Sequence, residues 1–146
     1  MVISTRGRYA LRVMIELAEH GDEFVPLKML ADRQQISRKY LEHILPLLGR
    51  NSLVLAAQGK GGGYRLARKP ADYTVGEILT ATEMGFSPVA CLENGATPCP
   101  RAEKCKTLPM WREFMSVTRN FFDRITLEDL IFQKGILKTN LNNEVE

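Results

Sequence analysis

The three cysteines of this 146-residue chain, Cys91, Cys99 and Cys105, lie close together and are separated by seven and then five residues. Most residues between them are glycine, proline, asparagine or charged types, which favour turns over regular helices and strands. We therefore predict one irregular loop, residues 84–107, that bends back and gathers the three thiols. Thiolates gathered on a loop are soft ligands for an iron–sulfur cluster, for zinc or for copper(I).

Besides an iron–sulfur cluster, the sequence leaves three interpretations of the cysteines open. A structural disulfide is disfavoured because the cysteine count is odd and the chain shows no export signal. Structural zinc usually takes cysteine pairs two to four residues apart, and this chain has none. Thiols without any ligand are the third interpretation.

Composition narrows the class of protein. The chain is 45% hydrophobic and 25% charged, as expected for one globular domain with a core. No apolar run of about eighteen residues or signal-like start is present, so we expect a cytoplasmic protein with no membrane partner. An enzyme is not expected, because no nucleophile–base pair or carboxylate pair has a recognisable spacing.

Charge is distributed unevenly along the chain. Residues 1–70 carry 12 Lys and Arg against 6 Asp and Glu, a balance of +6, while the remainder carries 8 against 11, a balance of −3. The N-terminal half is therefore the part that would attract a polyanion such as DNA.

Apolar periodicity predicts three helices in the N-terminal half. The first spans residues 4–20, the second begins near Pro26, and the third runs from a Ser37 cap to about Gly49, with Pro46 inside it. Two short helices joined by a tight connection, the second of them polar outside, are typical of a helix-turn-helix. Residues 52–67 then predict a β-hairpin with a glycine-rich tip, which in this position is a wing.

The C-terminal half predicts two further helices before a polar end. Thr74 and Glu77 have the spacing of a capping box for a helix at residues 75–83. Beyond Pro109, apolar and aromatic residues recur at three- and four-residue steps, which predicts a long helix whose broad apolar face either packs on its own domain or dimerises; we favour dimerisation. We therefore divide the chain into a winged helix-turn-helix at 1–83, the cysteine loop at 84–107, a dimerisation helix with a short capping helix at 108–133, and a flexible tail at 134–146.

The predicted DNA-binding residues come from three places. On the third helix, Arg38 and Lys39 could reach guanine edges or phosphates, His43 a base, Glu42 a cytosine amine and Tyr40 a phosphate, although Tyr40 could equally pack beneath the helix. The other predicted contacts are phosphate or narrow-groove contacts by the wing tip and the first helix, at Lys60, Gly61, Gly62 and Arg8. The alternative for the basic residues is ordinary solvated surface charge.

Five segments in this order resemble the IscR/NsrR/CymR-type family of bacterial winged-helix regulators. They cover about residues 1–133 and are Ser4–Ala10, Ile36–Glu42, Gly61–Leu66, Thr74–Ile78 and Thr126–Leu130. The resemblance implies a homodimeric regulator of a roughly palindromic DNA operator, with the third helix in the major groove and the wing in the minor groove. It also implies that the three cysteines hold an iron–sulfur cluster, 2Fe–2S in preference to 4Fe–4S, that senses iron, iron–sulfur or redox and nitric oxide status.

The chain departs from the family pattern at positions that matter for the cluster. IscR-like members carry a histidine ligand where this chain has Leu108, and NsrR-like members carry an acid where it has Arg8. The first cysteine gap is longer than in IscR-like members, and Gln58 replaces an arginine in the wing. The fourth ligand stays open among Glu93, Glu103, a residue of the other subunit and a small thiol. The alternatives are a cluster-free, CymR-type regulator controlled by a protein partner, and a metal or redox protein that does not bind DNA.

Overall fold

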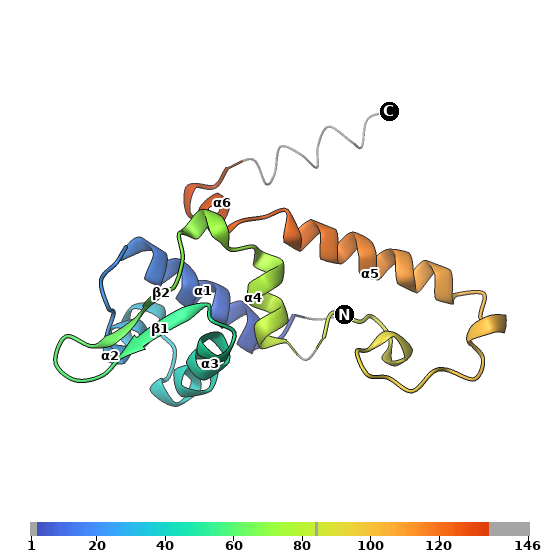
Figure 1. The fold of residues 1–146 in the computed structure, drawn as a ribbon, viewed down its shortest axis with the longest axis horizontal. Coiled ribbons are helices and arrows are strands. Elements are labelled where there is room, and N and C mark those ends of the chain that lie inside the picture. Colours follow the sequence, from blue (N-terminus) through green and yellow to red (C-terminus); the bar gives the residue numbers. More distant parts are fainter. Residues whose placement is uncertain (1–2, 84, 135–146) are drawn as a thin grey trace.

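The computed structural model describes residues 3–83 and 85–134, and within them the predicted fold class, mainly α with one small hairpin, is confirmed. Its elements are α1 Thr5–Glu19, α2 Leu27–Gln34, α3 Arg38–Arg50, β1 Val54–Ala57, β2 Gly63–Leu66, α4 Val75–Thr82, α5 Leu108–Asp123 and α6 Leu127–Phe132. Residues up to α4, together with α6, form a compact head, from which α5 extends to one side (Figure 1). The predicted flexible tail lies, apart from Lys134, outside the described residues.

The helices begin where the sequence predicts caps. Ser4 accepts a hydrogen bond from the Gly7 N–H at 3.2 Å, and Ser37 accepts one from the Tyr40 N–H at 3.1 Å. Each bond satisfies a backbone donor that has no partner inside the helix. Between α2 and α3, Gln35 takes the left-handed conformation with φ of 53°, which makes the tight turn of the helix-turn-helix. Helix α3 continues through Pro46, whose ring lies on the exposed face.

Helices α1 and α3 each contribute four residues to the core of the head. Four apolar residues of α1 have no exposed surface, and they pack on the predicted buried face of α3. Two residues from later in the chain, Tyr73 and Leu127, join the same core, each with no exposed surface. The principal members from the two helices are Ala10, Val13, Met14, Leu17, Leu41, Ile44, Leu45 and Leu48.

The wing is an antiparallel hairpin in which Val54 pairs with Leu66 and Ala57 pairs with Gly63. The segment before α2 extends it, because Val25 and Tyr64 form an antiparallel bridge beside β2. Gly63 has φ of 141°, and a Cβ there would overlap the backbone carbonyl of Val25. The hairpin is therefore attached to the helix-turn-helix at a point where only glycine fits.

The start of α4 corrects one prediction. Thr74 accepts a hydrogen bond from the Glu77 N–H at 3.0 Å, as a capping box requires. The Glu77 carboxylate, however, pairs with Arg68 at 2.6 Å and does not return to the backbone of Thr74, so the predicted capping box is only half formed. A complete capping box occurs at α6, between Thr126 and Asp129.

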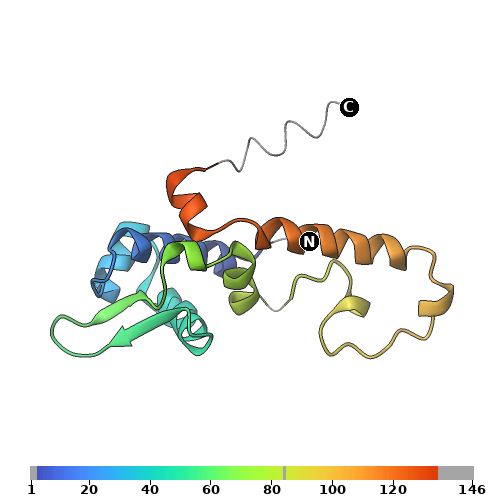
Figure 2. The same cartoon turned by 45° about the horizontal axis from the view of Figure 1, so that its top comes forward.

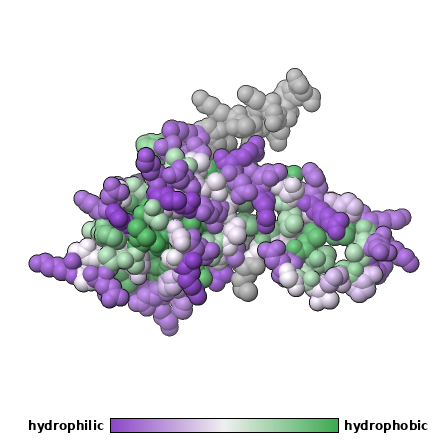
Figure 3. Space-filling view, in the orientation of Figure 1, coloured by the Kyte–Doolittle hydropathy of each residue, from purple (hydrophilic) through white to green (hydrophobic). Residues whose placement is uncertain are grey.

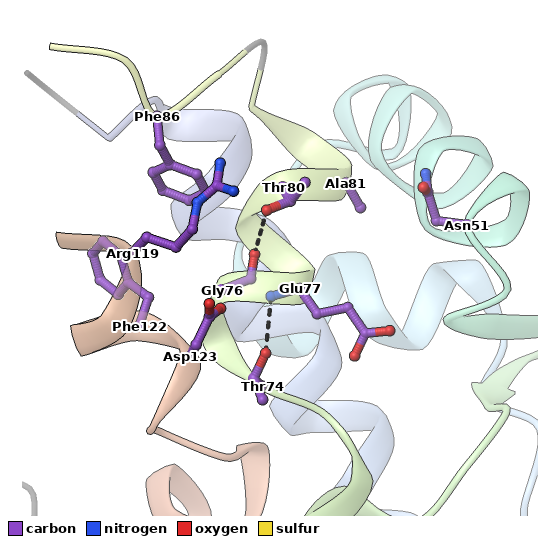
Figure 4. A pocket seen from close by; sticks show the side chains of 10 residues that line it. All are labelled: Asn51, Thr74, Gly76, Glu77, Thr80, Ala81, Phe86, Arg119, Phe122 and Asp123. Atoms are coloured by element: carbon purple, nitrogen blue, oxygen red, sulfur yellow. Dashed lines mark hydrogen bonds between the residues drawn. The ribbon is translucent and has the colours of Figure 1, made fainter. Parts of the chain in front are cut away.

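The junction between α4 and α5 has its own small apolar cluster, in which Val75, Leu79 and Phe86 pack with Phe122 and Ile125 among others. A cavity of about 240 Å³ opens beside it (Figure 4). The close-up shows the Thr80 hydroxyl donating to the backbone carbonyl of Gly76 at 2.7 Å. This contact surface attaches the C-terminal end of α5 to the head.

The remainder of α5 has little contact with the head. Leu108 is its one buried residue, and Figure 2 shows the helix running outward beside the cysteine segment. Three apolar side chains at steps of four and three residues stay largely exposed: Met110 at 54%, Phe114 at 43% and Val117 at 57%. The two interpretations of the apolar face thus apply to different parts of the helix. Its C-terminal end packs on the head, whereas Met110, Phe114 and Val117 stay exposed in the part of the chain that the structure describes. No helix in the described residues is long and apolar enough to span a membrane.

Candidate functional site

The three cysteines, spread over the predicted loop, line one cavity. Residues 85–107 are irregular apart from short 3₁₀ turns at Ala90–Leu92 and Ala102–Lys104, and the three thiols are free. The cavity measures about 170 Å³ and lies between this segment and the first turns of α5. Apolar residues gather on the visible face of this lobe, at the right of Figure 3. The lining residues are Cys91, Leu92, Pro98, Cys99, Ala102, Cys105, Leu108 and Arg112.

The surroundings of the thiols favour negative charge at Cys105. Its Sγ lies 3.4 Å from the Thr107 hydroxyl oxygen. Hydrogen bonds from the side chain and then the backbone of Thr107, with a smaller contribution from the charge of Arg101, lower the pKa of the Cys105 thiol. Arg112 adds a guanidinium to the cavity wall. Thiolate ligands and anionic groups are therefore favoured at this position.

The donor chemistry of the cavity suits a group held by several soft sulfur ligands. No cluster of three or more His, Cys, Asp or Glu residues in the described ranges is arranged to hold a single metal ion. Glu93 and Glu103, both exposed, are not among the cavity-lining residues, whereas Leu108 lies in its wall. The chain therefore brings three thiols to one space and places an apolar side chain beside them.

The residues predicted to contact DNA from the third helix lie mostly on the outer surface of α3. Arg38, Lys39, Glu42 and His43 are all exposed on α3. Tyr40 is half-buried, and its ring meets that of Tyr9 edge to face at a centroid distance of 5.3 Å. Much of the Tyr40 side chain is therefore covered by packing against Tyr9, which is the packing alternative considered for it above.

At the wing, Lys60 and Gly61 are exposed at the tip and Gly62 is half-buried. The Gly62 N–H donates to the Gly59 carbonyl at 3.0 Å, which closes the tip. Gly59 and Gly61 have φ of 85° and 77°, values that favour glycine. Arg8 is exposed on the first turns of α1, where its guanidinium donates to the Thr5 hydroxyl at 3.1 Å.

A buried acid holds the helix-turn-helix together. Glu16 on α1 is 4% exposed and accepts hydrogen bonds from His20 at 3.0 Å and from the Gln34 amide at 2.6 Å. It also forms an ion pair with Arg33 of α2, at 2.5 Å. Burial acts to raise the pKa of Glu16, but the hydrogen bonds from His20 and Gln34 and the charge of Arg33 outweigh it, so the pKa is lowered. This network fixes α2, and with it the entry into α3.

Some residues of these sites were not identified by sequence reasoning. Arg112 enters the cysteine cavity from α5, and Arg50 lies on the same side of α3 as Tyr40 and His43. The spacing of 40, 43, 47 and 50 along one helix is a signal that could have identified Arg50. Nothing in the local sequence indicates that Arg112 reaches the cysteines.

Comparison with known proteins agrees with this geometry. The Rrf2 family model, described as an iron-dependent transcriptional regulator, matches residues 3–133. The HTH-type transcriptional regulator IscR of Pectobacterium atrosepticum is 33% identical over 138 residues, which are 94% of this chain and 83% of that protein. The IscR of Aliivibrio salmonicida is 32% identical over 147 residues, which are 100% of this chain and 86% of that protein.

Solved structures give the same result. CymR, the global cysteine regulator of B. subtilis, matches with a TM-score of 0.72 and 33% identity, over 92% of this chain and 99% of that one. IscR of T. potens matches with a TM-score of 0.70 and 32% identity, over 92% and 89% of the two chains. These relatives are transcriptional regulators and not enzymes, in agreement with the prediction from the sequence. The family resemblance is confirmed as well. The winged-helix chain with its three gathered cysteines belongs to the Rrf2 family of transcriptional regulators.

Proposed function

We propose that this protein is a homodimeric, DNA-binding transcriptional regulator whose affinity for a roughly palindromic operator is tuned by an iron–sulfur cluster. The single observation that carries the proposal is that Cys91, Cys99 and Cys105 line one cavity. The similarity to IscR proteins supports the same assignment. A bound cluster would supply a redox-active and labile iron centre, with 2Fe–2S favoured over 4Fe–4S.

The residues of the chain have distinct roles in this proposal. The three cysteines hold the group as thiolates, and Arg112 offsets their negative charge. The apolar wall formed by Leu92 and Leu108 limits access of water to the sulfur atoms. Since neither Glu93 nor Glu103 lines the cavity, the fourth ligand comes from a second subunit or from a small thiol. Iron, iron–sulfur or redox and nitric oxide status is the proposed signal.

DNA recognition is assigned to the exposed residues of α3 and to the wing. Arg38, Lys39 and His43 contact bases and phosphates in the major groove, and Glu42 discriminates between base pairs. Lys60 and the glycines of the wing tip enter the minor groove, and Arg8 contacts a phosphate. Two heads read one operator when the exposed apolar residues of α5 pair across a dimer.

An anaerobic purification tests the cluster. Wild type and Cys99→Ala are compared by absorbance, by iron and sulfide content, and by gel shift on DNA at several salt concentrations. Iron and sulfide in wild type with loss in the variant is the expected result. A wild type that takes up no iron or sulfide, even on reconstitution, would contradict it.

A second candidate function is a cluster-free regulator that a protein partner controls, as the resemblance to CymR-type members implies. The observation that favours it is the structural similarity to CymR of B. subtilis. This function predicts a colourless protein that binds DNA with an affinity independent of added iron. The third alternative, a metal or redox protein without DNA binding, is set aside because the chain belongs to a family of transcriptional regulators.

A further inference from the structure

A basic groove lies beside the DNA-reading face of α3, where the N-terminal end of α1 approaches it. Its volume is about 520 Å³, and none of its lining residues is acidic. The four residues that α3 contributes recur at steps of three, four and three, so they form one stripe along the helix. The lining residues are Ser4, Arg6, Tyr40, His43, Leu47 and Arg50.

The groove offers hydrogen-bond donors that the protein itself does not use. The Nε of Arg6 is shielded from solvent and has no partner in residues 3–83 or 85–134. Arg50 uses its Nε on the Pro46 carbonyl at 3.3 Å, and its terminal nitrogens have no partner within those ranges. A shielded donor without a partner is rare. Because the Nε of Arg6 is shielded, an acceptor from outside the chain would meet the terminal nitrogens of the Arg6 guanidinium, which lines the groove. Two guanidinium groups, each a planar fork, suit the oxygens of a phosphate.

One wall of this groove is tied to the start of the cysteine segment. The backbone N–H and the hydroxyl of Ser4 both donate to the same oxygen of Glu83, at 3.0 and 2.7 Å. Glu83 is the residue directly after α4. The carboxylate reaches Ser4 by passing over Gly7, where a Cβ would overlap it. Any shift of the chain at Glu83 therefore acts on the groove.

We propose that this groove holds a phosphate of the DNA backbone beside the major groove that α3 enters, and that Glu83 positions the groove through Ser4. The inference rests on the DNA-binding function proposed above and deepens it. Helix-turn-helix proteins obtain much of their register from phosphate contacts that flank the reading helix. Arg6 and Arg50 contact the phosphate, and Glu83 acts as a positioning residue only.

Salt dependence of binding to a short duplex of random sequence tests the phosphate contacts. Fluorescence anisotropy gives the slope of log K against log salt for wild type, Arg6→Ala, Arg50→Ala and Arg124→Ala. Each lost phosphate contact lowers the slope by about 0.9. Arg124, exposed at the end of α5, controls for the loss of one positive charge. We expect reduced slopes for Arg6→Ala and Arg50→Ala relative to Arg124→Ala.

Equal slopes for the three variants would overturn the groove assignment while leaving DNA binding intact. A wild type that binds no duplex at any salt concentration would instead overturn the proposed function itself. Titration with inorganic phosphate tests whether the groove binds a free phosphate group in place of a phosphate of the DNA backbone. If Arg6→Ala abolishes phosphate binding but leaves the duplex slope unchanged, the groove serves a small phosphorylated ligand and the DNA assignment is wrong.

Two variants of equal charge test the role of Glu83. Glu83→Gln keeps a carbonyl oxygen that accepts from Ser4, whereas Glu83→Ala removes the acceptor. We expect Glu83→Ala to bind the duplex several-fold more weakly than Glu83→Gln, with a lower salt slope, at equal helix content by circular dichroism. Equal affinities and slopes for the two variants would overturn the positioning role.

Discussion

Val25 and Tyr64 exchange two backbone hydrogen bonds, of 2.7 and 2.9 Å, that attach the wing to the segment leading into α2. Gly63 makes this approach possible, because a Cβ there would overlap the Val25 carbonyl. We expect Gly63→Ala to lower the free energy of unfolding by roughly 2–3 kcal/mol and to weaken DNA binding more than the lost stability alone explains. Urea unfolding and anisotropy on duplex DNA measure the two effects.

The matched control for this change is Gly61→Ala at the wing tip. Gly61 also has positive φ, but a Cβ there would meet nothing within 4 Å. Its cost is that of the backbone conformation alone, about 1 kcal/mol. If Gly63→Ala is no more destabilising than Gly61→Ala, the attachment of the wing at Val25 contributes nothing to its position.

Glu16 makes the stability of the head depend on pH. Its pKa is lowered in the folded state, so its contribution is present above the ordinary value of 4.5 and is lost as the pH falls through the lower folded value. We expect Glu16→Gln to cost about 2 kcal/mol at neutral pH. The difference between wild type and variant should shrink as pH falls below the ordinary value, in urea titrations at a series of pH values. If the difference in unfolding free energy does not change with pH, the charge of Glu16 is not what stabilises its network with His20, Gln34 and Arg33.

The exposed apolar stripe of α5 predicts an effect on assembly. Phe114→Glu places a charge at its middle, and we expect dimerisation to weaken by roughly ten-fold or more. Light scattering during size-exclusion chromatography reports the mass across a dilution series. Ser116→Glu, about half a turn away on the same helix and also exposed, is the control and should remain dimeric. Identical masses for the two variants would show that the exposed apolar stripe of α5 is not part of the dimer interface.

Leu108 in the cavity wall predicts a gain of function that rests on the proposed cluster. Leu108→His places an imidazole beside the three thiols, and we expect the cluster to be lost more slowly in air than in wild type. Absorbance decay after exposure to air measures the rate. Leu108→Phe, which fills the same space without a ligand atom, should show no slowing. Equal decay in the two variants would mean that residue 108 does not reach the metal.

Local signals in the sequence predicted much of the head correctly. Ser4 and Ser37 cap their helices because a cap depends on residues only three positions apart. The capping box at Thr74 failed because Arg68, nine residues from Glu77, takes the Glu77 carboxylate. Arg112 was missed for a similar reason, since its place in the cavity depends on how α5 lies against the cysteine segment. Contacts that depend on tertiary packing cannot be predicted from the spacing of residues along the sequence.

The backbone contacts at the base of α5 also bear on how the chain is made. The Leu127 N–H donates to the Tyr73 carbonyl at 3.0 Å, and the Val75 N–H donates to the Ile125 carbonyl at 2.8 Å. Leu127 is completely buried in the core of the head. The chain is synthesised from its N-terminus, so the earlier residues of the head are made before Leu127. Their core is complete only once Leu127 has packed into it. The three cysteines lie before Leu127 in the chain, so they leave the ribosome before the core of the head can be completed.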